Sequence, residues 1–213
     1  MVRYLVIVLA VVACEKGESK TRQLDLDLVH ITPDAKLRTD TVGEGQFSET
    51  ATFVLVDAEN TGREGAYVTL AGELTDANDQ VVSEFKAQSL WIPAGELRTY
   101  ALVDRERKPR PTARKARIKV RSASIPETPP PARVDQIREL SDDGKLVVQG
   151  TLHNDAPRPG QIMVIASFHG VDGRPMTRPF TLLKVPAHTD QAVQFVSPPG
   201  AKHGTIYVGE MSF

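Results

Sequence analysis

Hydrophobic and polar residues alternate along short stretches of this chain, as they do in β-strands that bury one face. Between residues 67 and 74, the pattern sets Val68, Leu70 and Leu74 against Tyr67, Thr69 and Glu73. Residues 24–28 and 117–121 alternate in the same way, and residues 162–169 are almost continuously apolar, as in a central strand. Beyond the first fourteen residues, no stretch of twelve or more has the 3.6-residue period of a helix. The pattern predicts an all-β protein.

The pattern occurs twice, because residues 53–85 align with residues 146–180. In each copy an apolar strand ends in Asn, a Gly-bearing turn leads to a second apolar strand, and an Asp turn and a Pro-Ala turn follow. The matched positions are Asn60 with Asn154, Gly65 with Gly160, Asp76 with Asp172, and Pro93-Ala94 with Pro186-Ala187. Their offsets lie between 93 and 96 residues. The repeat predicts one fold that is duplicated.

Turn signals divide the chain into segments of strand length and predict two tandem immunoglobulin-like β-sandwiches, 23–123 and 133–213. A proline-rich linker, 124–132, separates them. The sequence Ser-Asp-Asp-Gly-Lys at 141–145 predicts a hairpin turn. In 117–121, Ile118 and Val120 are expected to face inward and three cations outward, as in a charged edge strand.

The first residues predict a signal peptide, 1–13, followed by a polar tether, 14–22. Arg3 supplies positive charge, residues 5–12 are apolar, and small Ala13 precedes Cys14. Eight to ten apolar residues in a helix reach about 12–15 Å, whereas the bilayer hydrocarbon is about 30 Å thick. This length excludes Cys14 as part of a transmembrane helix, and a second cysteine that would favour a redox thiol is absent from the sequence.

Val11-Val12-Ala13-Cys14 resembles the lipobox of bacterial lipoproteins. The resemblance implies cleavage before Cys14, a diacylglyceryl group on its sulfur and an acyl chain such as palmitate on the new amino terminus. Glu15, which is not Asp, favours the outer membrane over the inner by that family's sorting habit. The alternative is an ordinary secretory signal that happens to end near a cysteine.

The body of the chain is similar to the FxLYD-type and related immunoglobulin-like modules of bacterial envelope proteins. Asn60-Thr61-Gly62, Leu74-Thr75-Asp76 and Pro93-Ala94-Gly95 occupy the places of that pattern, and Asn154, Val171-Asp172-Gly173 and Pro186-Ala187 form a weaker second copy. The chain departs from the pattern at its aromatic position, which is Leu74 in the first copy. The resemblance implies a binding or spacing module and no catalytic residues.

The chain contains few residue patterns of the kinds that catalyse reactions or bind metals. The net charge is -1 and the chain has one cysteine, which excludes global attraction to nucleic acid, an internal disulfide and a thiolate metal cluster. The sequence holds no HExxH, GxSxG, P-loop or GxGxxG motif, so we predict no catalytic residue, metal or cofactor.

Two histidines have an aspartate nearby in the sequence with which they could pair in space, namely His153 with Asp155 and His169 with Asp172. Both histidines are expected to be solvated residues at strand ends. A Ser-His-Asp site assembled from distant residues stays open.

One segment is strongly basic, since nine of the seventeen residues 105–121 are Lys or Arg and only one is Glu. The nine cations are Arg105, Arg107, Lys108, Arg110, Arg114, Lys115, Arg117, Lys119 and Arg121. The plainer interpretation is a solvated loop and a charged edge strand. The alternative is a patch for anionic glycan, lipid headgroups or a protein partner. Trp91, the only tryptophan, lies next to a turn and is expected to pack in the core, with a ligand platform as the alternative.

These observations predict a lipid-anchored protein of the cell envelope that binds or scaffolds a partner without catalysis. Expected partners are the membrane, through lipid on Cys14, and an envelope protein, with anionic glycan or lipid headgroups as further candidates and no nucleic acid. The alternative function is an envelope hydrolase or transferase with an unrecognised site.

Overall fold

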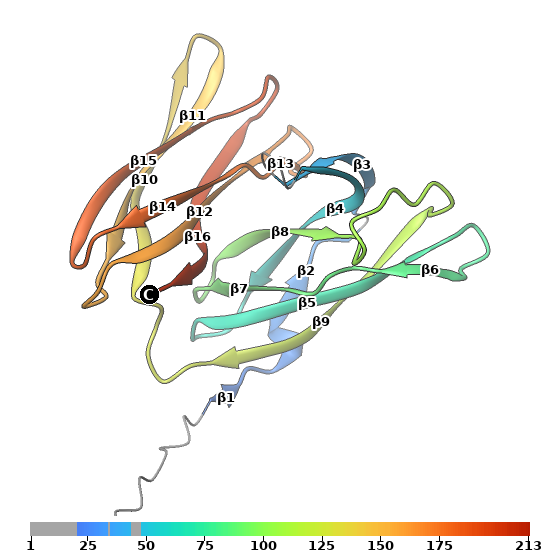
Figure 1. The fold of residues 1–213 in the computed structure, drawn as a ribbon, viewed down its shortest axis with the longest axis horizontal. Coiled ribbons are helices and arrows are strands. Elements are labelled where there is room, and N and C mark those ends of the chain that lie inside the picture. Colours follow the sequence, from blue (N-terminus) through green and yellow to red (C-terminus); the bar gives the residue numbers. More distant parts are fainter. Residues whose placement is uncertain (1–20, 34, 44–47) are drawn as a thin grey trace, which may run out of the picture.

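The computed structural model describes residues 21–33, 35–43 and 48–213, and its elements are nearly all strands (Figure 1). The first half contains β1 (Arg22–Gln23), the 3-10 helix η1 (Leu26–Leu28), β2 (Val29–Ile31), β3 (Leu37–Val42), β4 (Glu49–Asn60), β5 (Ala66–Thr75), β6 (Val81–Glu84), β7 (Gln88–Ile92), β8 (Leu97–Val103) and β9 (Lys115–Ile125). The second half contains β10 (Ala132–Asp142), β11 (Lys145–Asn154), β12 (Gly160–His169), β13 (Pro175–Thr177), β14 (Phe180–Val185), β15 (Thr189–Val196) and β16 (His203–Ser212). The prediction of an all-β sandwich fold is confirmed.

The strand pairings of the two halves correspond, as the sequence repeat predicted. In the first half β4 pairs with β8, and β5 pairs with β6, β7 and β9. In the second half β11 pairs with β15, and β12 pairs with β13, β14 and β16. Every one of these pairs is antiparallel. Each half therefore has two sheets, and apolar side chains fill the space between them.

The halves differ at the strand that borders β4 and β11. In the second half β10 runs along β11 with a register shift between Asp135 and Arg138. In the first half two separate strands take that place, β2 beside residues 58–60 and β3 beside residues 49–54. The register shift of β10 in the second half thus corresponds to the connection between β2 and β3 in the first half.

Two buried asparagines close the same turn in both halves. The Asn60 amide nitrogen donates to the carbonyls of Glu64 and Ile92 at 2.8 and 3.0 Å, and its oxygen accepts from Gly62 N–H at 2.9 Å. Asn154 donates in the same manner to Val185 and Pro186 and accepts from Ala156 N–H. Each side chain joins the end of one sheet to the end of the other, which gives the repeated Asn a structural reason.

The charged strand and the hairpin turn predicted from the sequence are both present in the structure. Ile118 and Val120 are half-buried while Arg117, Lys119 and Arg121 are exposed, so the charged strand is confirmed. That stretch of β9 pairs with β5 alone, because β1 reaches only Ser124 and Ile125. The hairpin turn is also confirmed, with positive φ at Asp143 and Gly144.

The alternating stretch 24–28 is not a strand, and that prediction is wrong. Asp25 is the N-cap residue of η1, and its carboxylate accepts from the N–H of Asp27 at 3.1 Å. A short acidic side chain that bonds its own backbone competes with strand pairing. Leu24 instead anchors the segment, since it is buried and donates its N–H to the Ala123 carbonyl. In the segment expected as a linker, β9 extends to Ile125 and β10 begins at Ala132.

The two halves pack against each other through side chains that point away from the core of the second half. On β12, Ile162, Val164, Ala166 and Phe168 belong to the second core, whereas Ile165 joins the core cluster of the first half. Tyr207 of β16 joins that cluster too, and Met163 and Phe180 pack against it. The alternation of β12 therefore serves two cores, and the halves share apolar contacts.

Replacing Asn60 with Ala tests the role of the buried turn. The variant loses two donated hydrogen bonds and one accepted bond at a buried position, so we expect the free energy of unfolding to fall by about 2–4 kcal/mol. Urea denaturation followed by circular dichroism measures it. Asn78→Ala is the matched control, because the side chain of Asn78 is exposed and only its N–H takes part in a turn bond. Equal stability of the two variants would contradict this role.

Candidate functional site

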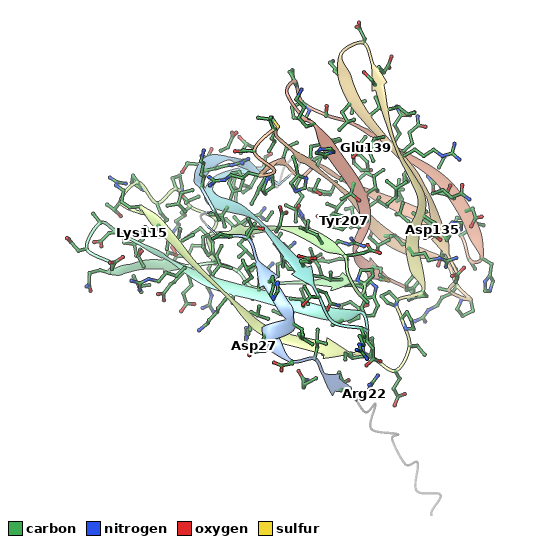
Figure 2. All side chains as sticks on the ribbon, turned by 180° about the vertical axis from the view of Figure 1, so that it is seen from behind. Arg22, Asp27, Lys115, Asp135, Glu139 and Tyr207 are labelled. Atoms are coloured by element: carbon green, nitrogen blue, oxygen red, sulfur yellow. The ribbon has the colours of Figure 1, made fainter. Side chains whose placement is uncertain are left out.

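Cys14, the expected lipidation residue, lies outside the described residues. The described chain enters the fold at β1, where Arg22 forms an ion pair with Glu64 at 2.6 Å. Figure 2 shows Arg22 at one end of the β9 region and Lys115 at the other. The Lys115 end of the basic segment therefore lies far from the point where the chain enters the fold.

Carboxylates neutralise most of the nine cations predicted as an anionic-partner patch. The ion pairs are Arg105 with Glu84, Arg107 with Glu49, Lys108 with Glu106, Arg110 with Asp104 and Glu106, Lys115 with Asp79, and Arg117 with Glu73 and Asp79. Arg114 donates to the carbonyls of Pro111 and Ala113. Lys119 and Arg121 have no carboxylate partner among the described residues. The single basic run is therefore two different structures, a loop whose cations are mostly paired with carboxylates and a strand that also carries the unpaired Lys119 and Arg121.

The loop that follows β8 folds around the buried carboxylate of Asp104. Arg110 donates to both of its oxygens at 2.8 and 3.2 Å, Ser83 donates at 2.5 Å, and the N–H groups of Glu106 and Lys108 donate at 3.1 Å. Burial raises the pKa of Asp104, but the hydrogen bonds from Arg110, Ser83 and Lys108 outweigh it and lower the pKa overall. These charges hold the loop together, which favours the structural interpretation for this part of the segment.

Asp104→Asn tests this loop. A carboxyl whose pKa is lowered by folding stabilises the fold above its unfolded pKa, about 3.9, and the stabilisation is lost as pH falls through the lower folded pKa. We therefore expect the variant to be about 3 kcal/mol less stable than wild type at pH 7, with a smaller difference at pH 3. Urea denaturation at both pH values measures it. Asp79→Asn is the control, because its ion pair is exposed, and a loss as large there would contradict the central role of Asp104.

A groove of about 880 Å³ runs along the outer face of β5, and it contains the open part of the basic segment. Its floor is made of the small residues Ala71, Gly72 and Ala87. A Cβ on Gly72 would lie 2.3 Å from the Arg117 carbonyl oxygen, so glycine allows β5 and β9 to approach here. One side is formed by Arg117, Lys119 and Arg121 of β9, and the other by Glu84, Lys86 and Arg105.

The groove is electropositive. Five cations and two carboxylates, Glu73 and Glu84, line it. Both carboxylates are engaged by arginines, at 3.2 Å from Arg117 to Glu73 and 2.9 Å from Arg105 to Glu84. Lys86, Lys119 and Arg121 are exposed and have no ion-pair partner in the described chain. Three positive charges are thus available to an anion in this groove.

An aromatic pair lies on the same face of the sheet, farther along β5. Tyr67 pairs in register with Trp91 of β7, and their rings meet edge to face with centroids 5.3 Å apart. Trp91 is half-buried and is absent from the core cluster, so the prediction that it packs in the core is wrong. Its ring lies against Gly65, where a Cβ would be 2.3 Å from Cζ2. The outward position of Tyr67 was readable from the alternation, but its pairing with Trp91 required the register.

A second cluster of polar groups lies where the two halves meet. Asp57 of β4 is buried and accepts from the hydroxyl of Thr99 at 2.5 Å, and its other oxygen lies 3.0 Å from Nε2 of His169 on β12. The Thr99 carbonyl accepts from the Tyr207 hydroxyl at 2.6 Å and from Nε of Arg178 at 2.7 Å. In Figure 2, Tyr207 lies between the halves. The cluster joins the halves through partners that are far apart in sequence.

The structure pairs the histidines differently from the prediction. His169 meets Asp57 and not Asp172, and His153 meets Asp190 at 2.6 Å and not Asp155. Their side chains are 13% and 15% exposed, so the expectation that they are solvated is wrong. The aspartates close in sequence are not the partners. Strand pairing brings Asp190 to His153, and the contact between the halves brings Asp57 to His169.

The cluster does not assemble a nucleophile with a base in the described chain. Ser167 is buried two residues before His169, but its hydroxyl has no hydrogen-bond partner. A Ser-His-Asp mechanism requires the serine within hydrogen-bond reach of the histidine. Within the same residues, no three His, Cys, Asp or Glu side chains gather as a metal site. No observation here favours the hydrolase alternative.

Comparison of the chain with protein families, with curated proteins and with solved structures found no match. Among residues 21–33, 35–43 and 48–213, no helix is long and apolar enough to cross a membrane.

Tyr207→Phe tests the contact between the halves. It removes the buried hydrogen bond that the hydroxyl donates to the Thr99 carbonyl and the 3.3 Å bond that it accepts from Nε of Arg178, so we expect the free energy of unfolding to fall by about 1 kcal/mol. Fluorescence of Trp91, the only tryptophan, reports unfolding of the first half although the substitution lies in the second. Tyr67→Phe is the control, because no hydrogen bond of the Tyr67 hydroxyl is found in the described chain. An unchanged transition of Trp91 in Tyr207→Phe would show that the halves unfold separately.

Proposed function

We propose that this chain is a lipid-anchored protein of the bacterial envelope that binds an anionic partner without catalysing a reaction. Residues 8–17 support the anchor, since the apolar run ends at Cys14 in the lipobox order and a polar tether follows. Glu15 supports the outer membrane as the destination. The binding role rests on the folded body.

The groove along β5 is the observation that carries the binding role. Its three exposed cations, Lys86, Lys119 and Arg121, have no partner among the described carboxylates. In the neighbouring loop, by contrast, Lys108 and Arg110 pair with carboxylates of the loop itself. Unpaired cations on an edge strand hinder pairing with other chains, and an electropositive hollow also concentrates anions. The sharing of apolar contacts between the halves supports a rigid body in which the groove keeps its position relative to the second half.

Cys14→Ser tests the anchor. Two acyl chains hold a protein on a bilayer, while loss of the attachment sulfur leaves no lipid to bury. We expect the wild-type protein in the membrane fraction and the variant in the soluble fraction of lysed bacteria that express it. Separation of inner from outer membranes then measures the destination of the wild-type chain.

The matched control keeps a cysteine but moves it. Cys14→Ser combined with Ser19→Cys retains one thiol outside the lipobox order, and we expect it to be soluble. If Cys14→Ser stays with the membrane, the lipoprotein assignment is wrong. If wild type is found in the inner membrane, only the outer-membrane assignment is wrong.

A further inference from the structure

We propose that the outer face of the sheet formed by β9, β5 and β7 is a binding site for an acidic polysaccharide, with anionic groups in the groove and a sugar ring on the aromatic pair. The proposal rests on the binding role proposed above and adds the class of ligand. It does not depend on the lipid anchor.

Aromatic, hydroxyl-bearing and cationic side chains follow one another along the outer face of β5. The outward residues of this strand are Tyr67, Thr69, Ala71 and Glu73, two residues apart. Tyr67 has Trp91 and Ser124 as its register neighbours, Thr69 has Ser89 and Ser122, and Ala71 has Lys119. The face therefore changes from aromatic to hydroxyl-bearing to cationic along one axis.

The dimensions of the face fit several units of a chain better than one small anion. From Tyr67 to Ala71 the strand rises by four residues, which is about 13 Å. The hydroxyls of Thr69, Ser89 and Ser122 occupy the middle, where they can donate to and accept from a polar ligand. The small floor around Ala71 leaves a hollow beside the cations. An extended polar molecule can reach both ends at once.

Each end suits a different part of an acidic sugar chain. Lys119 and Lys86 are point charges, and Arg121 offers a planar fork that matches carboxylate or phosphate oxygens. At the other end, Trp91 is half-buried and backed by Gly65 and Tyr67, which fixes its ring at low entropic cost. The apolar C–H face of a sugar ring can pack on an aromatic surface of this kind.

The same observations disfavour a planar anionic membrane as the occupant. A flat bilayer cannot enter the hollow above Ala71, whereas a narrow chain can. Glu73 and Glu84 are paired with Arg117 and Arg105, and towards a polysaccharide they can also accept hydrogen bonds from sugar hydroxyls. The mixed charge and the concave shape thus point to a narrow chain rich in hydroxyl groups.

The test uses the full chain, purified in detergent, with polygalacturonate as the acidic polysaccharide and dextran as the neutral one. Because Trp91 is the only tryptophan and lies on the proposed face, its fluorescence should change as polygalacturonate binds. We expect saturable binding that weakens as salt is added, and no change with dextran. Mixed micelles of phosphatidylglycerol and the same detergent form the third arm, and we expect them to bind more weakly than polygalacturonate.

Two variants separate charge from shape. Lys119→Gln with Arg121→Gln removes two unpartnered cations from an exposed strand, and we expect binding about tenfold weaker. Ala71→Leu keeps every charge but fills the floor, and we expect it to weaken binding as well. Lys145→Gln with Lys202→Gln is the matched control, since these exposed lysines lie in the second half, and we expect wild-type affinity.

The proposal is overturned if polygalacturonate binds no better than dextran, if the Lys119 and Arg121 substitutions leave its affinity unchanged, or if only the phosphatidylglycerol micelles bind. The binding assay is done in detergent solution and reads the groove alone. Failure of the anchor would appear in the fractionation of Cys14→Ser. Absence of binding by both anionic probes, polygalacturonate and phosphatidylglycerol, would remove the proposed binding role itself.

Discussion

The open edge of β8 is the constraint on which the arrangement of the two halves depends. β8 pairs with β4 on one side only, and an unpaired strand edge that is removed from water must find other partners. The second half provides them, because Tyr207 and Arg178 both donate to the Thr99 carbonyl. Gln88 supplies another, by accepting from the N–H of Ala101. The edge that could have invited aggregation instead holds the halves together.

The same contact explains why the sequence repeat did not produce two equal faces. The outward residues of β12 contact the first half, so that face of the second copy is covered. The corresponding face of β5 in the first copy stays open and carries the groove with Lys119 and the aromatic pair around Trp91. The corresponding strands thus differ in role: the outward face of β12 forms the contact between the halves, whereas that of β5 lies at the surface.

Some turn residues and inward-facing residues could be predicted from interactions between residues close in sequence. Asn60 and Asn154 were identified as turn residues because an Asn side chain can bond its own backbone, and the structure places both in the same turn. The inward positions of Ile118 and Val120 followed from a period of two. Residues 24–28 have the same period, but the Asp25 carboxylate captured a neighbouring N–H and formed a helical turn. Alternation alone does not separate these outcomes, because it does not count competing side-chain bonds.

The sequence by itself determined the strand content, the repeat, the turn residues and the expectation of a lipid attachment at Cys14. Those depend on short-range chemistry and on patterns that a strand displays along its own length. The partner of His169, the neutralisation of the loop around Asp104 and the outward place of Trp91 were decided only by the tertiary structure. Each requires knowledge of which distant strand lies alongside, and that register comes from the burial of the whole sheet, which no single segment contains.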